Sequence, residues 1–229
     1  AGQLRLREGQ VLVIGAGGLG CPLALYLGAA GVGRLTLVDD DQVELANLQR
    51  QIAFDMAQLG RDKARALCDR VTAINPGCQC QPWVGRVGPE SLQALVSVVD
   101  LVVDASDNFA TRFAVNAACV AAGVPLVSGA AIRAEGQLAV FHPAREGGCY
   151  RCLYPETGAE TLSCSEAGVL GPLVGMVGAS QAMEALKLLA GIGEPLLGRL
   201  LILDAMTMRW RELRFAKDPE CPECGSSVA

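Results

Sequence analysis

Two cysteine pairs stand far apart in this chain, and each has the CxxC spacing of a metal-binding knuckle. They are Cys149 with Cys152, and Cys221 with Cys224. Four thiolates form a closed tetrahedral site for Zn²⁺, with no position left open for a substrate. We therefore expect these cysteines to bind a structural zinc ion that joins the end of the chain to its middle. A pair of redox dithiols is the alternative, but neither pair opens a thioredoxin-like βαβ unit.

A glycine-rich loop has the pattern of a phosphate-binding turn. Gly15, Gly17, Gly18 and Gly20 lie between an apolar strand and a helical pattern. Glycines there let a phosphate approach the backbone, whose N–H groups and positive helix end attract it. Asp39 ends the next apolar strand, where a carboxylate can accept hydrogen bonds from ribose hydroxyls. The pattern predicts nucleotide binding without separating NAD from ATP, and the alternative is a turn that serves packing alone.

Polar and charged side chains follow the position expected to bind ribose. They are Asp41, Asn47, Arg50 and Gln51, and Lys63 opens the next helical pattern. Arg50 and Lys63 can neutralise the charge that develops on the phosphate oxygens of a triphosphate. All five are therefore candidate ATP ligands, and Arg50 and Lys63 are candidate catalytic groups. An exposed charged loop without a ligand is the alternative.

Asp107 and Asn108 come soon after the apolar strand at 101–104, at the carboxyl end where open α/β sheets bind ligands. A carboxylate there can hold Mg²⁺ against phosphates, because proteins usually bind this ion through one or two carboxylates and substrate oxygens. We expect Asp107 to be a catalytic magnesium ligand and Asn108 to line the nucleotide site, with Asp104 as a possible second acidic group. The alternative is that Asp107 only caps the helix that follows.

Cys164 lies in a loop before the glycine-rich start of a helical pattern. A loop thiol near a helix N-terminus can be acidic and nucleophilic, so Cys164 is a candidate catalytic thiol for sulfur transfer or an acyl link, and an inert thiol is the alternative. Cys21, Cys68 and Cys119 fall in helical apolar patterns and are expected in the core. His142, the only histidine, ends an edge-like strand and is expected to be structural, which argues against reactions that need a histidine base.

Apolar strands and helical patterns alternate along the first part of the chain. Strands are expected at 10–14, ending near Asp39, at 101–103 and at 125–127, and helices from about Leu19, Asp62 and Asn108. This order predicts a parallel sheet with right-handed crossovers. The chain is expected to run directly from its N-terminus into the first strand.

After residue 136 the pattern changes. The remaining segments are an alternating one at 137–141, a loop at 154–168, a helix at 172–190 and a second alternating one at 208–214. The alternating segments are typical of half-exposed antiparallel strands. We therefore expect an α/β fold whose Rossmann-like, mainly parallel sheet is continued by antiparallel strands. Residues 1–135 would form the nucleotide-binding core, and residues 136–229 a C-terminal extension that shares the sheet and carries the zinc site.

The composition of the 229 residues argues against several classes of protein. With 51% hydrophobic residues the chain can bury a large core, so its ten cysteines are not expected to form the disulfide scaffold of a small secreted domain. We expect a reducing, cytoplasmic location. A net charge of −5 without a run of Lys and Arg argues against nucleic acid as a partner. The longest apolar stretch, 170–190, is interrupted by polar residues and is not expected to cross a membrane.

The chain resembles the HesA/MoeB/ThiF family of adenylyltransferases, relatives of ubiquitin-activating enzymes, over nearly its whole length. The resemblance rests on the glycine loop, Asp39, residues 47–51, Lys63, Asp107 with Asn108 and the paired CxxC motifs, in that order. It implies ATP-dependent activation of the C-terminal carboxylate of a small sulfur-carrier protein ending in Gly-Gly. A separate sulfur donor would then act on the activated carrier.

The resemblance also implies roles for individual residues. The loop around Gly17 and the Lys63 ammonium would hold phosphates, and Asp39 would hold the ribose. Asp107 would bind Mg²⁺. Arg50 would reach into the site of a second subunit, which implies a homodimer.

Two branches of the family fit the sequence, one specific for molybdopterin synthase and one for the thiazole pathway of thiamine biosynthesis. Residues 128–137 look more like the molybdopterin branch. Cys164 matches the position where the thiazole branch forms a covalent link to its carrier, but the molybdopterin branch also has a cysteine there. We expect the small subunit of molybdopterin synthase as the carrier and keep the thiazole carrier as the alternative.

One departure from the family lies at the N-terminus. Family members carry an arginine-bearing helix before the first strand that helps bind phosphates, and its motif is absent here, so the N-terminus is expected to be incomplete. A catalytically inactive dimeric scaffold that docks a partner is therefore one rival hypothesis. An NAD-dependent oxidoreductase is another, supported only by the glycine loop and Asp39.

Overall fold

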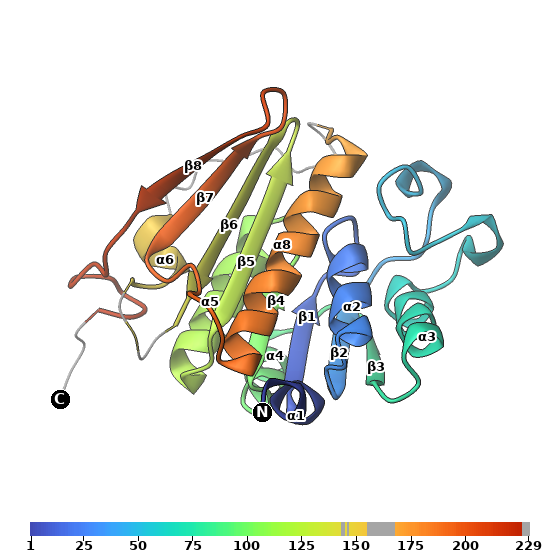
Figure 1. The fold of residues 1–229 in the computed structure, drawn as a ribbon, viewed down its shortest axis with the longest axis horizontal. Coiled ribbons are helices and arrows are strands. Elements are labelled where there is room, and N and C mark those ends of the chain that lie inside the picture. Colours follow the sequence, from blue (N-terminus) through green and yellow to red (C-terminus); the bar gives the residue numbers. More distant parts are fainter. Residues whose placement is uncertain (143–144, 146, 155–167, 226–229) are drawn as a thin grey trace.

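One eight-stranded sheet runs through the molecule in the computed structural model, which describes residues 1–142, 145, 147–154 and 168–225 (Figure 1). The strands are β1 (Gln10–Ile14), β2 (Arg34–Asp39), β3 (Gln79–Val84), β4 (Leu101–Asp104), β5 (Leu126–Ile132), β6 (Glu135–Phe141), β7 (Arg199–Asp204) and β8 (Arg209–Arg214). Their order is β3-β2-β1-β4-β5-β6-β7-β8. Neighbours from β3 to β5 are parallel and neighbours from β5 to β8 are antiparallel. The expected α/β fold is confirmed.

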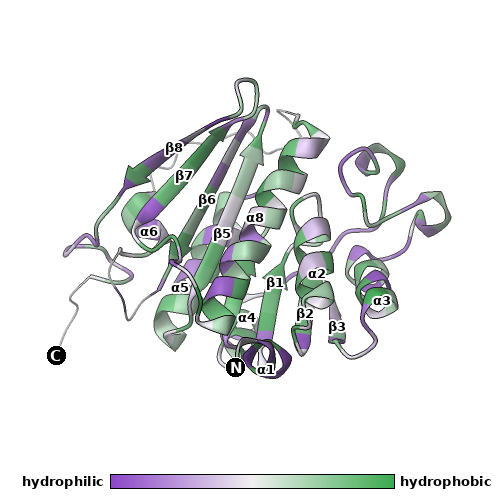
Figure 2. Cartoon of the chain, viewed as in Figure 1, coloured by the Kyte–Doolittle hydropathy of each residue, from purple (hydrophilic) through white to green (hydrophobic). Residues whose placement is uncertain are grey.

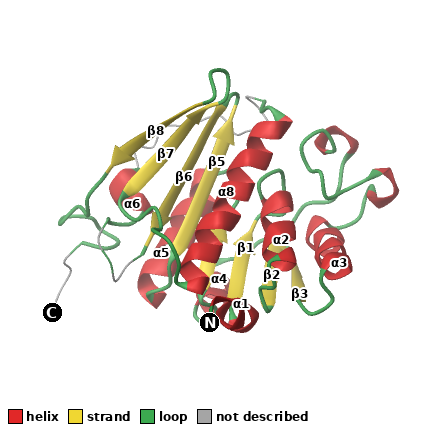
Figure 3. Cartoon of the chain, in the orientation of Figure 1, coloured by secondary structure: helices red, strands yellow, loops and turns green. Residues whose placement is uncertain are grey.

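Helices cover both faces of this sheet. They are α1 (Gly2–Glu8), α2 (Gly20–Ala29), α3 (Lys63–Ile74), α4 (Pro89–Val96), α5 (Phe109–Ala122), α6 (Tyr150–Leu153) and α8 (Gly171–Ala190), with single 3₁₀ turns η1 (Leu45–Asn47) and η2 (Met56–Gln58). One cluster of buried side chains includes residues of α2, α3 and α8, and the other includes residues of α4, α5 and α6. In Figure 3, α2 and α8 lie in front of the sheet and α4 lies behind it.

The central strands are apolar because both of their faces are covered. In β1, Val11 and Val13 belong to one buried cluster, and Leu12 and Ile14 belong to the other. Figure 2 shows hydrophobic colouring along β1, whereas α1 is hydrophilic over most of its length. The alternating segments were expected to be half-exposed strands, and this expectation is wrong: the outermost strand β8 is exposed at all six positions, and β6 is mostly buried.

By length and composition alone, the helix α8 is long and apolar enough to cross a membrane. Half of its most apolar 18-residue stretch is buried inside the fold, however, and the helix packs against α2, β5 and β6. Two of its polar side chains are buried and bonded within the fold. Gln181 donates to the carbonyl oxygen of Asp104 at 2.7 Å, and Glu184 accepts from the backbone N–H of Leu196 at 2.9 Å. This apolar helix is therefore placed as a core helix of the domain.

Two predictions at the level of elements need correction. The chain does not run directly into β1, because α1 precedes it and buries Leu6. The sequence of α1 has no apolar stripe that would predict a helix, and only one of its residues is buried. The strand that ends near His142 is not an edge strand, because β6 pairs with β5 and β7. The helices α4 and α6 and the strand β7 were not predicted. The domain boundary predicted after residue 135 falls at the first residue of β6, within the β5–β6 hairpin, and the division remains a prediction.

Candidate nucleotide site and cysteine cluster

The glycine loop turns the chain from β1 into α2 at the carboxyl end of the parallel strands. Gly15 has a left-handed backbone with φ of +99°, and a Cβ there would lie 2.7 Å from the carbonyl oxygen of Ala105. A Cβ on Gly20 would lie 2.0 Å from the carbonyl oxygen of Gly15. A Cβ on Gly18 would lie 2.8 Å from Val174 of α8. The loop is thus pressed between the end of β4 and α8, at positions where side chains do not fit.

Asp39 ends β2 and connects the glycine loop to the segment that follows it. Its carboxylate accepts one hydrogen bond from the N–H of Ala16 at 2.7 Å and another from the N–H of Asp41 at 2.9 Å. Burial raises the pKa of Asp39, and the two N–H groups and the Lys63 ammonium offset part of that rise. Each carboxylate oxygen has a second lone pair, so Asp39 retains acceptor capacity for a ligand hydroxyl.

Lys63 is the first residue of α3, and its side chain points toward the carboxylates of Asp39 and Asp41. Its ammonium donates to Asp41 at 2.7 Å, although the residue is only 4% exposed. Carboxylate oxygens of Asp39, Asp40 and Asp41 lie within 4.8 Å of one another. The structure therefore brings the predicted Asp39, Asp41 and Lys63 together in one charged cluster.

Arg50, Asn47 and Gln51 lie in the turn that includes η1. The guanidinium of Arg50 donates to the amide oxygen of Asn47 at 2.8 Å, and Asn47 donates to Glu44 at 3.2 Å. Gln51 is 3% exposed, and its amide nitrogen lies 3.7 Å from the position of a Cβ on Gly17. The predicted polar segment thus packs on the glycine loop, while the Arg50 side chain bonds within its own turn.

Asp107 and Asn108 stand where β4 gives way to α5, and they have different roles. Asn108 caps α5 by accepting from the N–H of Thr111 at 2.9 Å, so the helix is not capped by Asp107. Asp107 is exposed and available to a cation. Asp104 is fully buried and accepts from the N–H of Ser106 at 2.9 Å. Burial raises the pKa of Asp104, so it belongs to the interior and is not a second exposed acid.

A buried polar network behind this loop was not predicted from the sequence. Arg112 is 8% exposed and donates to the carbonyl oxygen of Ser106 at 2.8 Å. Asn116, one helical turn further along α5, is 1% exposed. The signal was present, because Asn108, Arg112 and Asn116 recur at intervals of four on one helix face.

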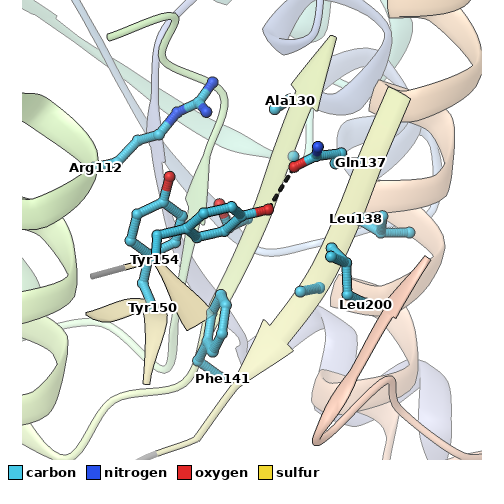
Figure 4. Close-up of a pocket in the computed structure, with 11 residues that line it drawn as sticks. Arg112, Ala130, Gln137, Leu138, Phe141, Tyr150, Tyr154 and Leu200 are labelled. Atoms are coloured by element: carbon cyan, nitrogen blue, oxygen red, sulfur yellow. Dashed lines mark hydrogen bonds between the residues drawn. The ribbon is translucent and has the colours of Figure 1, made fainter. Parts of the chain in front are cut away.

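A small cavity of about 10 Å³ adjoins this network, between α6 and strands β5 and β6. Figure 4 shows Arg112 and the rings of Tyr150 and Tyr154 around it, with the Tyr154 hydroxyl donating to Gln137. A cavity of this size holds about one water molecule. It is too small for a nucleotide.

The four CxxC thiols meet next to α5, beside Asn116. The Sγ atoms of Cys149 and Cys221 lie 3.7 Å apart, those of Cys152 and Cys224 lie 3.4 Å apart, and all four are within 4.8 Å of one another. Tetrahedral zinc with Zn–S bonds of ~2.3 Å places its sulfurs ~3.8 Å apart. None of the four is in a disulfide. The arrangement therefore fits a closed tetrathiolate site.

Polar contacts support the cluster from outside. Asn116 donates to Cys149 Sγ at 3.5 Å, and Arg151 pairs with Glu223 at 2.8 Å, which joins the two knuckles. Such contacts orient ligands before a metal binds.

The remaining predicted cysteines and the histidine lie away from the charged cluster, apart from Cys21. Cys21, Cys68 and Cys119 are buried, as predicted, and burial raises the pKa of Cys21 to about 12. His142 is half-buried, and burial, with Arg145 nearby, lowers its pKa. Cys164 lies outside the described residues.

Comparison with known proteins identifies relatives along the whole chain. The molybdopterin-synthase adenylyltransferase of Escherichia coli K12 is 48% identical over 224 residues, which are 98% of this chain and 90% of that protein. The sulfur carrier protein ThiS adenylyltransferase of the same organism is 47% identical over 228 residues, 100% of this chain and 90% of that protein.

A solved structure has the same fold. The crystal structure of E. coli MccB with ATP superposes with a TM-score of 0.87 at 22% identity, over 98% of this chain and 68% of that one. The model of the ThiF family matches residues 1–223. With that match and relatives at nearly half identity over its full length, the chain belongs to the ThiF family.

Proposed function

We propose that this protein uses MgATP to adenylylate the C-terminal glycine carboxylate of a small ubiquitin-like sulfur-carrier protein. The observation that carries the proposal is full-length identity of 47–48% to two proteins named as adenylyltransferases. The glycine loop beside Asp39, Lys63 and Asp107 supports it, because those groups suit a nucleotide and its metal.

In this proposal each part of the charged cluster has one task. The loop of Gly15, Gly17, Gly18 and Gly20 receives phosphates, while Asp39 accepts from the ribose. Lys63 neutralises phosphate charge, and Asp107 would hold Mg²⁺, which would screen the negative charge of the phosphates. Asp41, Asn47, Gln51 and Asn108 line the same site.

The reaction needs positioning and charge neutralisation and no general base. A terminal carboxylate with a pKa of ~3.5 is already ionised at neutral pH. Its oxygen attacks the α-phosphorus of ATP, a new P–O bond forms, and the bond to the β-phosphate breaks to release pyrophosphate. The mixed anhydride is then an electrophile for a separate sulfur donor. A chain with a single, half-buried histidine is suited to such a step.

We place Arg50 in the site of a second subunit. In a single chain its guanidinium bonds within its own turn, to Asn47. Large apolar side chains around that turn are exposed, with Leu45 at 63%, Ile52 at 67% and Met56 at 61%. An exposed apolar patch of this kind suits a subunit interface, and a homodimer would complete each site with an arginine from its partner.

We propose the four-cysteine cluster as a structural zinc site. Four thiolate ligands would leave the ion no open coordination position. The ion would therefore clamp residues 149–152 to residues 221–224 and take no part in the adenylyl transfer.

The carrier we propose is the small subunit of molybdopterin synthase, with the thiazole-pathway carrier as the second candidate. Residues 128–137 favour the first. The two named relatives are 48% and 47% identical, which does not separate the branches.

A pyrophosphate exchange assay tests both the proposed adenylylation and the identity of the carrier. Radioactive pyrophosphate should enter ATP only when a carrier ending in Gly-Gly is present, and a carrier without its last glycine is the matched control. Faster exchange with one carrier identifies the branch. Exchange with neither carrier, or tight NAD binding without ATP binding, would contradict the proposed function.

A further inference from the structure

Three polar side chains lie along one face of α5. Asn108, Arg112 and Asn116 are four residues apart, so they follow one another along the helix over a rise of about 12 Å. Arg112 and Asn116 are 8% and 1% exposed. Polar groups buried to this extent are retained only where they are bonded.

At one end of this face, Asn116 holds the first cysteine knuckle. Its amide nitrogen donates to Cys149 Sγ at 3.5 Å, and its amide oxygen accepts from the N–H of Tyr150 at 2.8 Å. One side chain thus fixes both a thiol and the start of α6.

At the other end, Arg112 holds the loop before Asp107. Its guanidinium donates to the carbonyl oxygen of Ser106 at 2.8 Å, and Ser106 donates its N–H to the buried carboxylate of Asp104 at 2.9 Å. The same loop presses on the glycine turn, because a Cβ on Gly15 would lie 2.7 Å from the Ala105 carbonyl oxygen. Movement at Arg112 would therefore move the loop beside the nucleotide site.

Aromatic packing closes the gap between the two ends. Tyr150 is 2% exposed and meets Phe113 of α5 edge-on, with ring centroids 5.5 Å apart. Its hydroxyl points toward the Arg112 guanidinium (Figure 4). The residue that Asn116 holds at its backbone is thus also packed beside Arg112.

We propose that the cysteine cluster and the nucleotide site are energetically coupled through this face of α5, with Asn116 and Arg112 as positioning residues. The coupling presupposes the proposed zinc and MgATP sites. An ordered, metal-bound knuckle keeps Tyr150 and Arg112 in place and so favours the loop arrangement that binds nucleotide. Coupling between two sites is reciprocal, so bound nucleotide must stabilise the metal site by the same free energy.

The test measures the zinc dissociation constant of the full chain by competition with a chelator, with and without a non-hydrolysable α,β-methylene ATP and Mg²⁺. Bound nucleotide should lower this dissociation constant about fivefold or more. In protein loaded with Co²⁺, nucleotide should also shift the absorption bands of the cobalt–thiolate site, which reports on folded protein alone.

The Asn116→Ala variant should lose both effects. Asn75→Ala is the matched control, because the amide oxygen of Asn75 also accepts from a backbone N–H, that of Gly77 at 3.0 Å, but Asn75 caps the end of α3, away from the cluster. The control should keep the change in zinc affinity and the spectral shift. If Asn116→Ala does not fold, Arg112→Lys replaces it and should lose both effects as well.

An equal change in zinc affinity in all variants would overturn the proposal, since nucleotide would then act through global stability. Unchanged zinc affinity in unsubstituted protein with nucleotide bound would overturn it too, while leaving the proposed function intact. Failure of the unsubstituted protein to bind nucleotide would contradict the proposed function itself and the coupling with it.

Discussion

The ammonium of Lys63 lies 2.7 Å from the carboxylate of Asp41, in a pair whose lysine side chain is 6% exposed and whose aspartate side chain is 64% exposed. The Lys63 ammonium is thus already removed from water in the free protein. A phosphate that replaces the exposed Asp41 carboxylate therefore binds a charged donor whose position is already fixed.

We predict that Lys63→Met lowers the rate of pyrophosphate exchange about 100-fold or more, because it removes a preorganised cation from beside the phosphates. Arg65→Ala is the control, since Arg65 lies two residues further along α3 and its side chain is 62% exposed. Steady-state exchange at saturating carrier measures both variants. Comparable losses in the two would show that general disturbance of α3, and not the ammonium, is responsible.

The assignment of Arg50 to a neighbouring subunit predicts complementation. Arg50→Ala and Lys63→Met should each be inactive alone. After the two are mixed and allowed to exchange subunits, about a quarter of the unsubstituted activity should return, because half of the dimers are mixed and each mixed dimer has one intact site. If Arg50 acts within its own chain, every site carries a defect and the mixture stays inactive.

Much of the candidate site was predictable because its chemistry depends on local spacing. The glycine loop, Asp39 and the CxxC pairs are short patterns with one physical purpose each. The spacing of Arg112 and Asn116 on one helix face is visible in the sequence, but their bonding partners are not, because these depend on how the chain folds. Asn116 contacts Cys149, which lies 33 positions away in the sequence, and no local pattern around Asn116 predicts that contact.

The structural role of the cysteine cluster predicts a loss of stability without zinc. Cys152→Ser should release the metal and lower the melting temperature by about 8 to 16 °C, for a loss of ~4 kcal/mol in a chain of this size. Cys68 is a buried thiol outside the cluster, so the Cys68→Ala variant should keep the full zinc content of the protein. Elemental analysis and thermal melts measure both. Full zinc content in Cys152→Ser would contradict the assignment.

The sheet was predictable where burial makes a simple pattern. β1 and β4 are buried on both faces and appear as apolar runs, whereas β8 is exposed on both faces, so burial does not account for its alternating sequence. β7 has a comparable apolar run, Leu200 to Leu203, that was overlooked. α1 could not be found in this way, because seven residues with one buried side chain have no periodicity to detect.

The raised pKa of Asp39 predicts a pH dependence of binding. The ionised carboxylate is the stronger acceptor for ribose, so affinity for MgATP should fall as pH drops through that raised pKa. Asp39→Asn should bind ~10-fold more weakly at neutral pH, with a smaller further loss on acidification. Because the phosphates titrate equally in both experiments, the ratio of the two dissociation constants isolates Asp39. A ratio independent of pH would refute the assignment.

The same shift affects folding with a defined sign. The folded state binds the Asp39 proton more tightly than the unfolded state, so this group costs stability as pH rises through its window and the full cost is present above the raised pKa. In Asp39→Asn the free energy of unfolding should therefore decline less with rising pH across that window. Urea denaturation at a series of pH values measures the difference, and a steeper decline in the variant would be the wrong sign.

Two helical glycines should respond in opposite directions to alanine. A Cβ on Gly20 would meet the Gly15 carbonyl oxygen at 2.0 Å, and this backbone atom cannot move without opening the loop against β4. A Cβ on Gly175 in α8 has no atom within 4 Å. We expect Gly20→Ala to lower the free energy of unfolding by about 3 kcal/mol, and Gly175→Ala to raise it by about 1 kcal/mol through helix propensity. Urea denaturation measures both changes. A neutral Gly20→Ala would mean that the glycine turn yields easily, and the case for a rigid phosphate loop, which depends on that close contact, would fail with it.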